Sequence, residues 1–127
     1  MTGESPVVLV VDDDASVLHA LGRLIRAAGF EARIFSTPRE ILASDIPRAN
    51  ACLVLDINLP EMNGVELHEA LIASGRGLPA IMITGRSDAR TQGLLHRAHP
   101  VAVLFKPFDE ILLLEAVTRA VAESRAS

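Results

Sequence analysis

The sequence predicts an α/β protein, a doubly wound three-layer sandwich in which five parallel strands lie between layers of helices. Short apolar runs recur along the chain, and the first, third and fourth are almost continuously apolar, as in strands covered on both faces. Segments of helical length and period separate the runs, and each can supply the crossover that parallel strands require. The predicted strands are Val7–Val11, Ala32–Phe35, Ala51–Leu55, Ala80–Thr84 and Val101–Phe105.

Helical spacing and capping residues justify five intervening helices. Apolar residues recur every three or four positions from Val17 to Ala28, and Gly29 suits the left-handed backbone that often ends a helix. Thr37-Pro38-Arg39-Glu40 reads as a capping box with proline at the first helical position, which begins the second helix. The other three are expected over Gly64–Ser74, over Asp88–Ala98 and, with Asp109 as a cap, to about Ser124.

Composition limits the classes of protein that fit. A chain of 127 residues, of which 50% are hydrophobic and 22% charged, predicts one folded domain over residues 1–127 and excludes intrinsic disorder. The 12 Lys and Arg against 16 Asp and Glu give a net charge of −4, which argues against direct nucleic-acid binding because that needs a basic surface.

The compartment is expected to be the cytoplasm. No apolar run approaches the roughly 20 residues of a membrane span, and the first six residues show no cationic region before an apolar stretch. Cys52 is the single cysteine, so a disulfide framework is excluded and a reducing compartment is favoured. We expect Cys52 to be a buried, chemically inert strand residue.

Polar side chains follow four of the predicted strands. Three aspartates follow the first strand, Asp56 ends the third, Thr84 ends the fourth and Lys106 follows the fifth. Ligands of doubly wound sheets bind outside the carboxyl ends of the strands, where these side chains would meet. The three aspartates are Asp12, Asp13 and Asp14.

This combination of groups predicts a phosphoryl acceptor assisted by Mg²⁺. Crowded carboxylates repel one another, and a hard dication with oxygen ligands removes that cost. Lys106 and Thr84 can donate to phosphoryl oxygens while Asp56 acts as the nucleophile. A simpler interpretation also fits each residue alone: the three aspartates cap and flank a helix, and Asp56 is an ordinary turn residue.

Four stretches of the sequence resemble the receiver domain of two-component response regulators, and the likeness extends from about Pro6 to Ser124. The resemblance implies a flavodoxin-like sheet with strand order 2-1-3-4-5. The most specific stretch surrounds Asp56 and includes Pro60 and Gly64. The stretches are Val10-Val11-Asp12-Asp13-Asp14, Leu53 to Gly64, Ile83-Thr84-Gly85 and Phe105-Lys106-Pro107-Phe108.

The family pattern implies a role for each matching residue. Asp12 and Asp13 are similar to the acidic pair that holds Mg²⁺, and Asp56 to the phosphoacceptor, which is also a metal ligand. Asn58 occupies the position whose backbone carbonyl reaches the metal. Thr84 resembles the switch hydroxyl. Lys106 resembles the lysine that pairs with the phosphoryl group, and Lys106-Pro107 resembles the usual cis peptide of the family. Asn58 and Arg86 resemble the positions that tune the rate of dephosphorylation.

Two departures from the pattern stand out. Val103 occupies the position at which receivers usually carry Tyr or Phe, three residues before the lysine. Phe105 has the same strand parity and either partly substitutes for that aromatic ring or is an ordinary core residue. His99-Pro100 replaces the more usual Gly-Ala, so the preceding helix is expected to be stiffer or shorter at its end. His96 and His99 are expected to be a surface pair rather than metal ligands.

The last predicted helix leaves one question open. Ile111 and Leu112 fall off its apolar stripe, and either mark a dimer or partner surface or pack under the preceding loop. The stripe itself consists of Leu113, Leu114, Val117, Ala120 and Val121.

The function implied is a signalling module, not an enzyme beyond its own phosphorylation and dephosphorylation. The donor would be a sensor histidine kinase or a phosphotransfer protein. The output would be the face formed by the fourth helix, fifth strand and fifth helix, which could also form a homodimer. Two alternatives remain open: a receiver that signals by association without phosphate, and a phosphatase of the haloacid dehalogenase type. The phosphatase would need an aspartate where Asn58 stands and room for a cap domain. The chain is either complete or part of a longer regulator.

Overall fold

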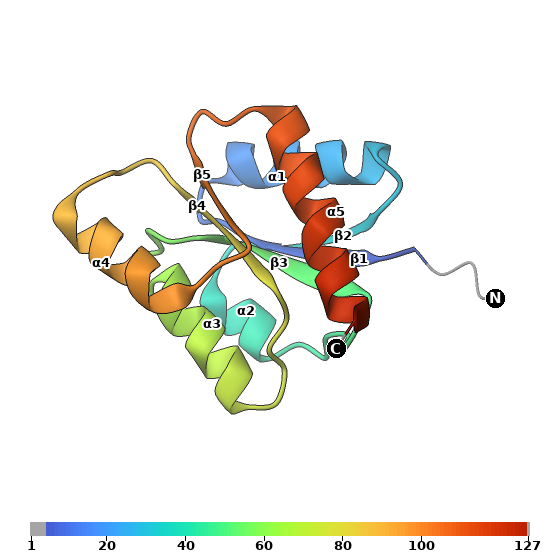
Figure 1. Ribbon diagram of the computed structural model, residues 1–127, viewed down its shortest axis with the longest axis horizontal. Helices are drawn as coiled ribbons and strands as arrows, with labels where there is room; N and C mark the ends of the chain where they lie inside the picture. The colour runs from blue at the N-terminus through green and yellow to red at the C-terminus, as the bar shows by residue number, and fades with distance from the viewer. Residues whose placement is uncertain (1–4, 127) are drawn as a thin grey trace.

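A computed structural model describes residues 5–126 as five strands alternating with five helices (Figure 1). The strands are all parallel and lie in the order β2-β1-β3-β4-β5, which confirms the expected fold. The strands are β1 (Val7–Val11), β2 (Glu31–Phe35), β3 (Ala51–Asp56), β4 (Ala80–Thr84) and β5 (Ala102–Phe105). The helices are α1 (Ala15–Ala27), α2 (Pro38–Leu42), α3 (Gly64–Ala73), α4 (Ala89–Ala98) and α5 (Glu110–Ala126).

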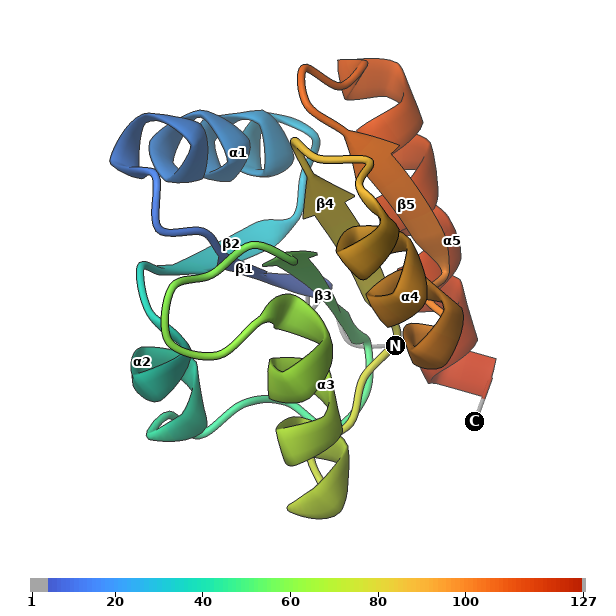
Figure 2. The ribbon, with the colours of Figure 1, turned by 90° about the vertical axis from the view of Figure 1, so that its left-hand side faces the viewer.

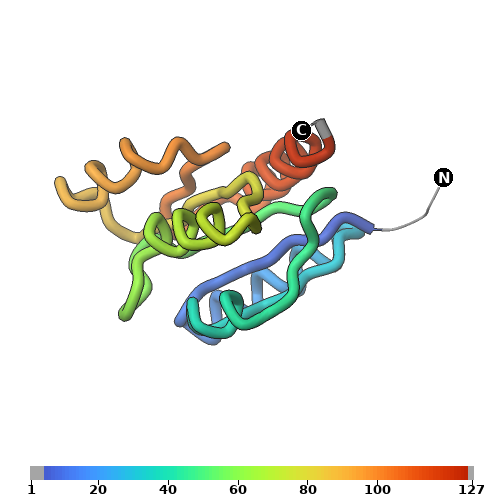
Figure 3. Tube along the Cα trace, turned by 90° about the horizontal axis from the view of Figure 1, so that it is seen from below, coloured from blue at the N-terminus to red at the C-terminus, as the bar shows by residue number. Residues whose placement is uncertain are grey.

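The sheet separates two apolar clusters, one under each layer of helices. Along β1, Leu9 belongs to the cluster shared with α3, whereas Val8 and Val10 belong to the cluster shared with α1 and α5. This alternation follows from the period of two in a strand. Figure 2 shows α1 and α5 on one side of the sheet, and Figure 3 shows α2 and α3 in front of the other. Both faces are therefore covered, as the continuous apolar runs predict.

The helices begin at the capping residues that their sequences supply. Asp14 caps α1 by accepting from the N–H groups of Ser16 and Val17, and Thr37 caps α2 by accepting from the N–H of Glu40. Asp109 accepts from the N–H of Ile111 at 2.7 Å at the start of α5. These bonds satisfy N–H groups that have no partner inside the helix.

The β5 edge of the sheet is the least covered part. Phe105 is 46% exposed, so of the two alternatives for this residue, the one that makes it an ordinary core residue is wrong. The reason is its position: β5 is an edge strand, and Phe105 faces a groove of about 300 Å³. The groove is lined by Gln92, Leu95, His96, Val103 and Phe105.

The start of α5 answers the question left open by the sequence. Ile111 is 68% exposed and Leu112 is 52% exposed, so neither packs under the preceding loop. The predicted stripe points inward, with Leu113 and Val117 fully buried and Leu114 partly buried. Within residues 5–126, no helix is long and apolar enough to cross a membrane.

Candidate functional site

The carboxyl ends of β1 and β3 place three carboxylates together. One oxygen from each of Asp12, Asp13 and Asp56 lies within 4.8 Å of the others. Asp12 and Asp56 are buried, whereas Asp13 is exposed at the rim. Asp14, the third aspartate after β1, is the α1 cap, so the simpler interpretation holds for that residue only.

Asp12 carries the least satisfied buried atom of the site. Its Oδ1 accepts the N–H of Asp14 at 2.9 Å. Its Oδ2 lies 3.1 Å from the Lys106 Nζ but accepts no hydrogen bond from any described residue. Burial, followed by the charge of Asp56, raises the pKa of Asp12 above its ordinary value, although Asp14 and Lys106 oppose the shift. An incompletely paired buried oxygen of this kind suits a cation.

Asp56 is held on both carboxylate oxygens. Its Oδ1 accepts the N–H of Asn58 at 2.9 Å, and its Oδ2 accepts from the Lys106 Nζ at 3.1 Å. Burial alone would lower the pKa of Lys106, but the hydrogen bond and charge of Asp56, and then the ion pair with Asp12, raise it. The lysine therefore stays positively charged beside the two buried carboxylates.

The loop after β3 is held close beneath Asp56. A Cβ added to Gly64 would lie 2.7 Å from the Asp56 carbonyl oxygen, so only glycine allows this approach. The N–H of Gly64 donates to the Ile57 carbonyl at 3.1 Å. Asn63 and Glu66 form a reciprocal capping box at the start of α3. The same loop carries Asn58, whose N–H donates to the Asp56 Oδ1.

Thr84 is brought to the site, but its hydroxyl does not reach Asp56. The fully buried hydroxyl donates to the Asn58 Oδ1 at 2.6 Å and accepts the N–H of Arg86 at 3.0 Å. The Arg86 side chain is exposed and lines a cavity of about 250 Å³ beside the site. The bond between Thr84 and Asn58 was not foreseen, and no spacing in the sequence signals it.

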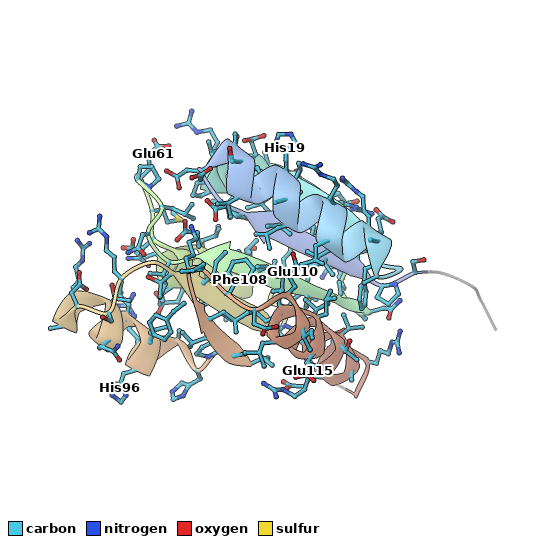
Figure 4. The ribbon with its side chains drawn as sticks, turned by 90° about the horizontal axis from the view of Figure 1, so that it is seen from above. His19, Glu61, His96, Phe108, Glu110 and Glu115 are labelled. Carbon is cyan, nitrogen blue, oxygen red and sulfur yellow. The ribbon has the colours of Figure 1, made fainter. Side chains whose placement is uncertain are left out.

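The other residues singled out by the sequence lie outside the acidic site. The Lys106-Pro107 peptide bond is cis. His99 caps α4 in the left-handed conformation, with a φ of 48°. Figure 4 shows His96 pointing away from α4, and no histidine in the described part of the chain joins a metal-type cluster. Cys52 is fully buried and unbridged, and burial raises its pKa to about 12, as an inert thiol requires.

The donor set fits a divalent cation with oxygen ligands. Three carboxylates meet at one point, and one of them has a buried oxygen that is ion-paired with Lys106 but accepts no hydrogen bond from a described residue. No thiol or imidazole joins them among the described residues. Such a set suits Mg²⁺ better than Zn²⁺, which is usually bound by sulfur and nitrogen. An acidic triad of this kind is typical of the receiver Mg²⁺ site.

Comparisons with known proteins agree with this geometry. Residues 8–118 match the model of the response regulator receiver domain. Nodulation protein W of Bradyrhizobium diazoefficiens is 36% identical over 119 residues, which cover 94% of this chain and 52% of that protein. The chain thus spans about half the length of the curated relatives that it matches.

Solved structures give the same result. The response regulator StyR is 38% identical with a TM-score of 0.85, covering 94% of this chain and 61% of StyR. A CheY-like receiver domain protein from Methanospirillum hungatei is 28% identical with a TM-score of 0.82, covering 95% of this chain and 97% of that one.

The family match also corrects one alternative. A receiver domain is not a conventional enzyme, so the haloacid dehalogenase type of phosphatase is excluded. The matched residues, the parallel sheet and the acidic pocket together lead to one conclusion: the chain belongs to the response regulator receiver family.

Proposed function

We propose that Asp56 accepts a phosphoryl group from a phosphohistidine on a sensor histidine kinase or a phosphotransfer protein. One carboxylate oxygen of Asp56 attacks phosphorus, the bond between phosphorus and the imidazole nitrogen breaks, and that nitrogen keeps the electron pair. The observation that carries the proposal is the placement of Asp56 between the Asn58 N–H and the Lys106 ammonium. The charged Lys106 can neutralise a phosphoryl oxygen without reorganisation.

The acidic triad would hold Mg²⁺ through the carboxylates of Asp12, Asp13 and Asp56, together with the backbone carbonyl of Asn58. The bound ion would neutralise charge that develops on the phosphoryl oxygens. The buried Oδ2 of Asp12, which accepts no hydrogen bond from a described residue, supports this assignment. Asn58 and Arg86 would tune the rate of dephosphorylation from the rim of the site.

Phosphorylation would shift the domain between two arrangements. Asp56 changes from one negative charge to about two, and the new oxygens can recruit Thr84 and Lys106. Moving a population from 1:99 to 99:1 needs about 5.5 kcal/mol of differential stabilisation, which a few charge-assisted hydrogen bonds in a partly buried site can approach. The face of α4, β5 and α5 is the proposed readout, with Val103 in place of the usual aromatic residue.

Exposed apolar side chains support that face as a contact surface for a protein partner or a second copy of the chain. Phe105, Ile111 and Leu112 are the large apolar residues exposed on β5 and α5. The net charge of −4 gives no support for direct nucleic-acid binding. Because the curated relatives are about twice as long, the output of the whole protein is a further proposal. We propose that residues 1–127 form a single receiver domain located in the cytoplasm. Its proposed target is a protein.

One observation favours signalling without phosphate as a second candidate. Val103 leaves the groove between α4 and β5 without the aromatic residue that usually couples to the switch hydroxyl. Phe105 lines the same groove, half-exposed, and offers an apolar surface in either phosphorylation state.

Labelling decides between the two candidates. Incubation with acetyl phosphate and Mg²⁺ should add the mass of one phosphoryl group, measured by intact-mass spectrometry. Asp56→Asn should abolish the addition, and removal of Mg²⁺ with a chelator should do the same. Absence of labelling in the wild type, or labelling that persists in Asp56→Asn, would contradict the proposal.

A further inference from the structure

The hydrogen bond between Thr84 and Asn58 uses the hydroxyl that the proposed switch requires. Thr84 has one hydroxyl proton, and it is donated to the Asn58 Oδ1 at 2.6 Å. The Thr84 oxygen also accepts the Arg86 N–H at 3.0 Å. Thr84 cannot turn toward Asp56 without giving up both bonds.

Asn58 is itself attached to the phosphoacceptor. Its backbone N–H donates to the Asp56 Oδ1 at 2.9 Å, while its side chain accepts from Thr84. A single residue thus joins the carboxylate that would be phosphorylated to the hydroxyl that would respond. Its backbone bond and its side-chain bond are separable, because a change of side chain leaves the N–H in place.

Thr84 has one other acceptor within reach. The Arg86 carbonyl oxygen lies 3.3 Å from the Thr84 hydroxyl, a longer and weaker contact than the one with Asn58. Because Thr84 is fully buried, loss of the short bond would leave its hydroxyl poorly satisfied. The amide of Asn58 is therefore what stabilises the observed orientation of Thr84.

We propose that Asn58 is a positioning residue, whose side chain holds the Thr84 hydroxyl away from Asp56 until a phosphoryl group competes for it. This inference rests on the proposed function. A phosphoryl oxygen carries more negative charge than an amide oxygen and is the stronger acceptor, which gives the exchange its direction. A stronger hydrogen bond between Thr84 and Asn58 leaves less of the free energy of phosphorylation to shift the domain to its second arrangement.

The first test needs no metal or phosphate. Asn58→Ala keeps the backbone N–H to Asp56 and removes the acceptor for Thr84. We expect faster amide hydrogen exchange at Arg86, whose N–H bonds to the Thr84 oxygen, with unchanged exchange in the strands β1 and β3. An unchanged rate at Arg86 would show that Thr84 keeps its orientation without Asn58, and would overturn the proposal.

The second test measures the competition itself. Beryllium trifluoride with saturating Mg²⁺ serves as a non-covalent phosphoryl mimic. Its apparent affinity is compared in the wild type, Asn58→Ala, Thr84→Val and the double variant. Asn58→Ala should tighten binding about two- to tenfold, which is the net effect of one hydrogen bond. In a Thr84→Val background the same change should have no effect, because the hydroxyl is absent. A titration with Mg²⁺ alone corrects for any change at the metal site.

The outcomes separate the inference from the proposed function. Equal tightening in both backgrounds, no tightening, or weaker binding in Asn58→Ala would overturn the role of Asn58 and leave phosphorylation of Asp56 untouched. A wild-type protein that fails to bind the mimic with Mg²⁺ would instead count against the proposed function.

Discussion

The centre of the sheet and its β5 edge are packed in different ways. Every side chain of β1, β3 and β4 is buried, whereas no residue of β5 is, and α4 beside it buries only Thr91. The proposed chemistry requires fixed distances between carboxylates, and the buried central strands supply them. The proposed switch requires an element that can move at low cost, and local rearrangement costs least where burial is small.

The largest expected effect compares two leucines in the two regions. Leu53 lies fully buried in the middle of β3, and Leu104 lies partly buried in β5. We expect Leu53→Ala to lower the free energy of unfolding by about 2–5 kcal/mol, because it leaves a cavity in a closed core. Leu104→Ala should cost about half as much, since less of its surface is buried. Urea unfolding of both variants measures the difference, and equal losses would show that the two regions are packed alike.

A smaller effect is expected for a buried charge at the centre. The pKa of Asp12 is raised above its ordinary value of 3.8. The charged carboxylate therefore destabilises the metal-free fold at pH values above its folded pKa, and the penalty disappears as the pH falls through that pKa toward the unfolded value. We expect Asp12→Asn to raise the free energy of unfolding by about 1 kcal/mol at neutral pH without metal.

The pH dependence and Mg²⁺ provide the controls for Asp12→Asn. The gain should shrink as the pH falls through the folded pKa and vanish by about pH 3, where Asp12 is protonated in both states of the wild type. Added Mg²⁺ should stabilise the wild type more than the variant, because the variant lacks a ligand. A variant that is less stable than the wild type at neutral pH without metal would show that Asp12 is better paired than its unbonded Oδ2 indicates.

The smallest effect on stability is expected at the β5 edge. Phe105 is 46% exposed, so Phe105→Ala should change the free energy of unfolding by about 1 kcal/mol or less. If the face of α4, β5 and α5 is the contact surface, the same variant should weaken self-association of the phosphorylated domain. Analytical ultracentrifugation checks this, with the exposed Ile72 of α3 as the matched control position. Equal weakening by Phe105→Ala and Ile72→Ala would remove the assignment of this face.

The fold could be predicted from the sequence because continuous apolar runs, joined by helices that allow parallel strands, are compatible with few sheet topologies. They placed Asp12 and Asp56 at one edge, since the carboxyl ends of parallel strands meet there. The hydrogen-bond partners of side chains in loops could not be predicted from the sequence. The bond from Thr84 to Asn58 depends on the path of the β3–α3 loop, and the exposure of Phe105 depends on how far α4 covers β5. Neither leaves a periodic signal.

The most direct measurement is a map of amide chemical shifts on addition of beryllium trifluoride and Mg²⁺. We predict large changes at the strand ends around Asp56 and Thr84 that continue into α4, β5 and the start of α5, with small changes in α2 and the interior of β1. Changes confined to the strand ends, or changes in α2 as large as those in α4, would contradict the claim that phosphorylation at the buried central strands rearranges the face of α4, β5 and α5.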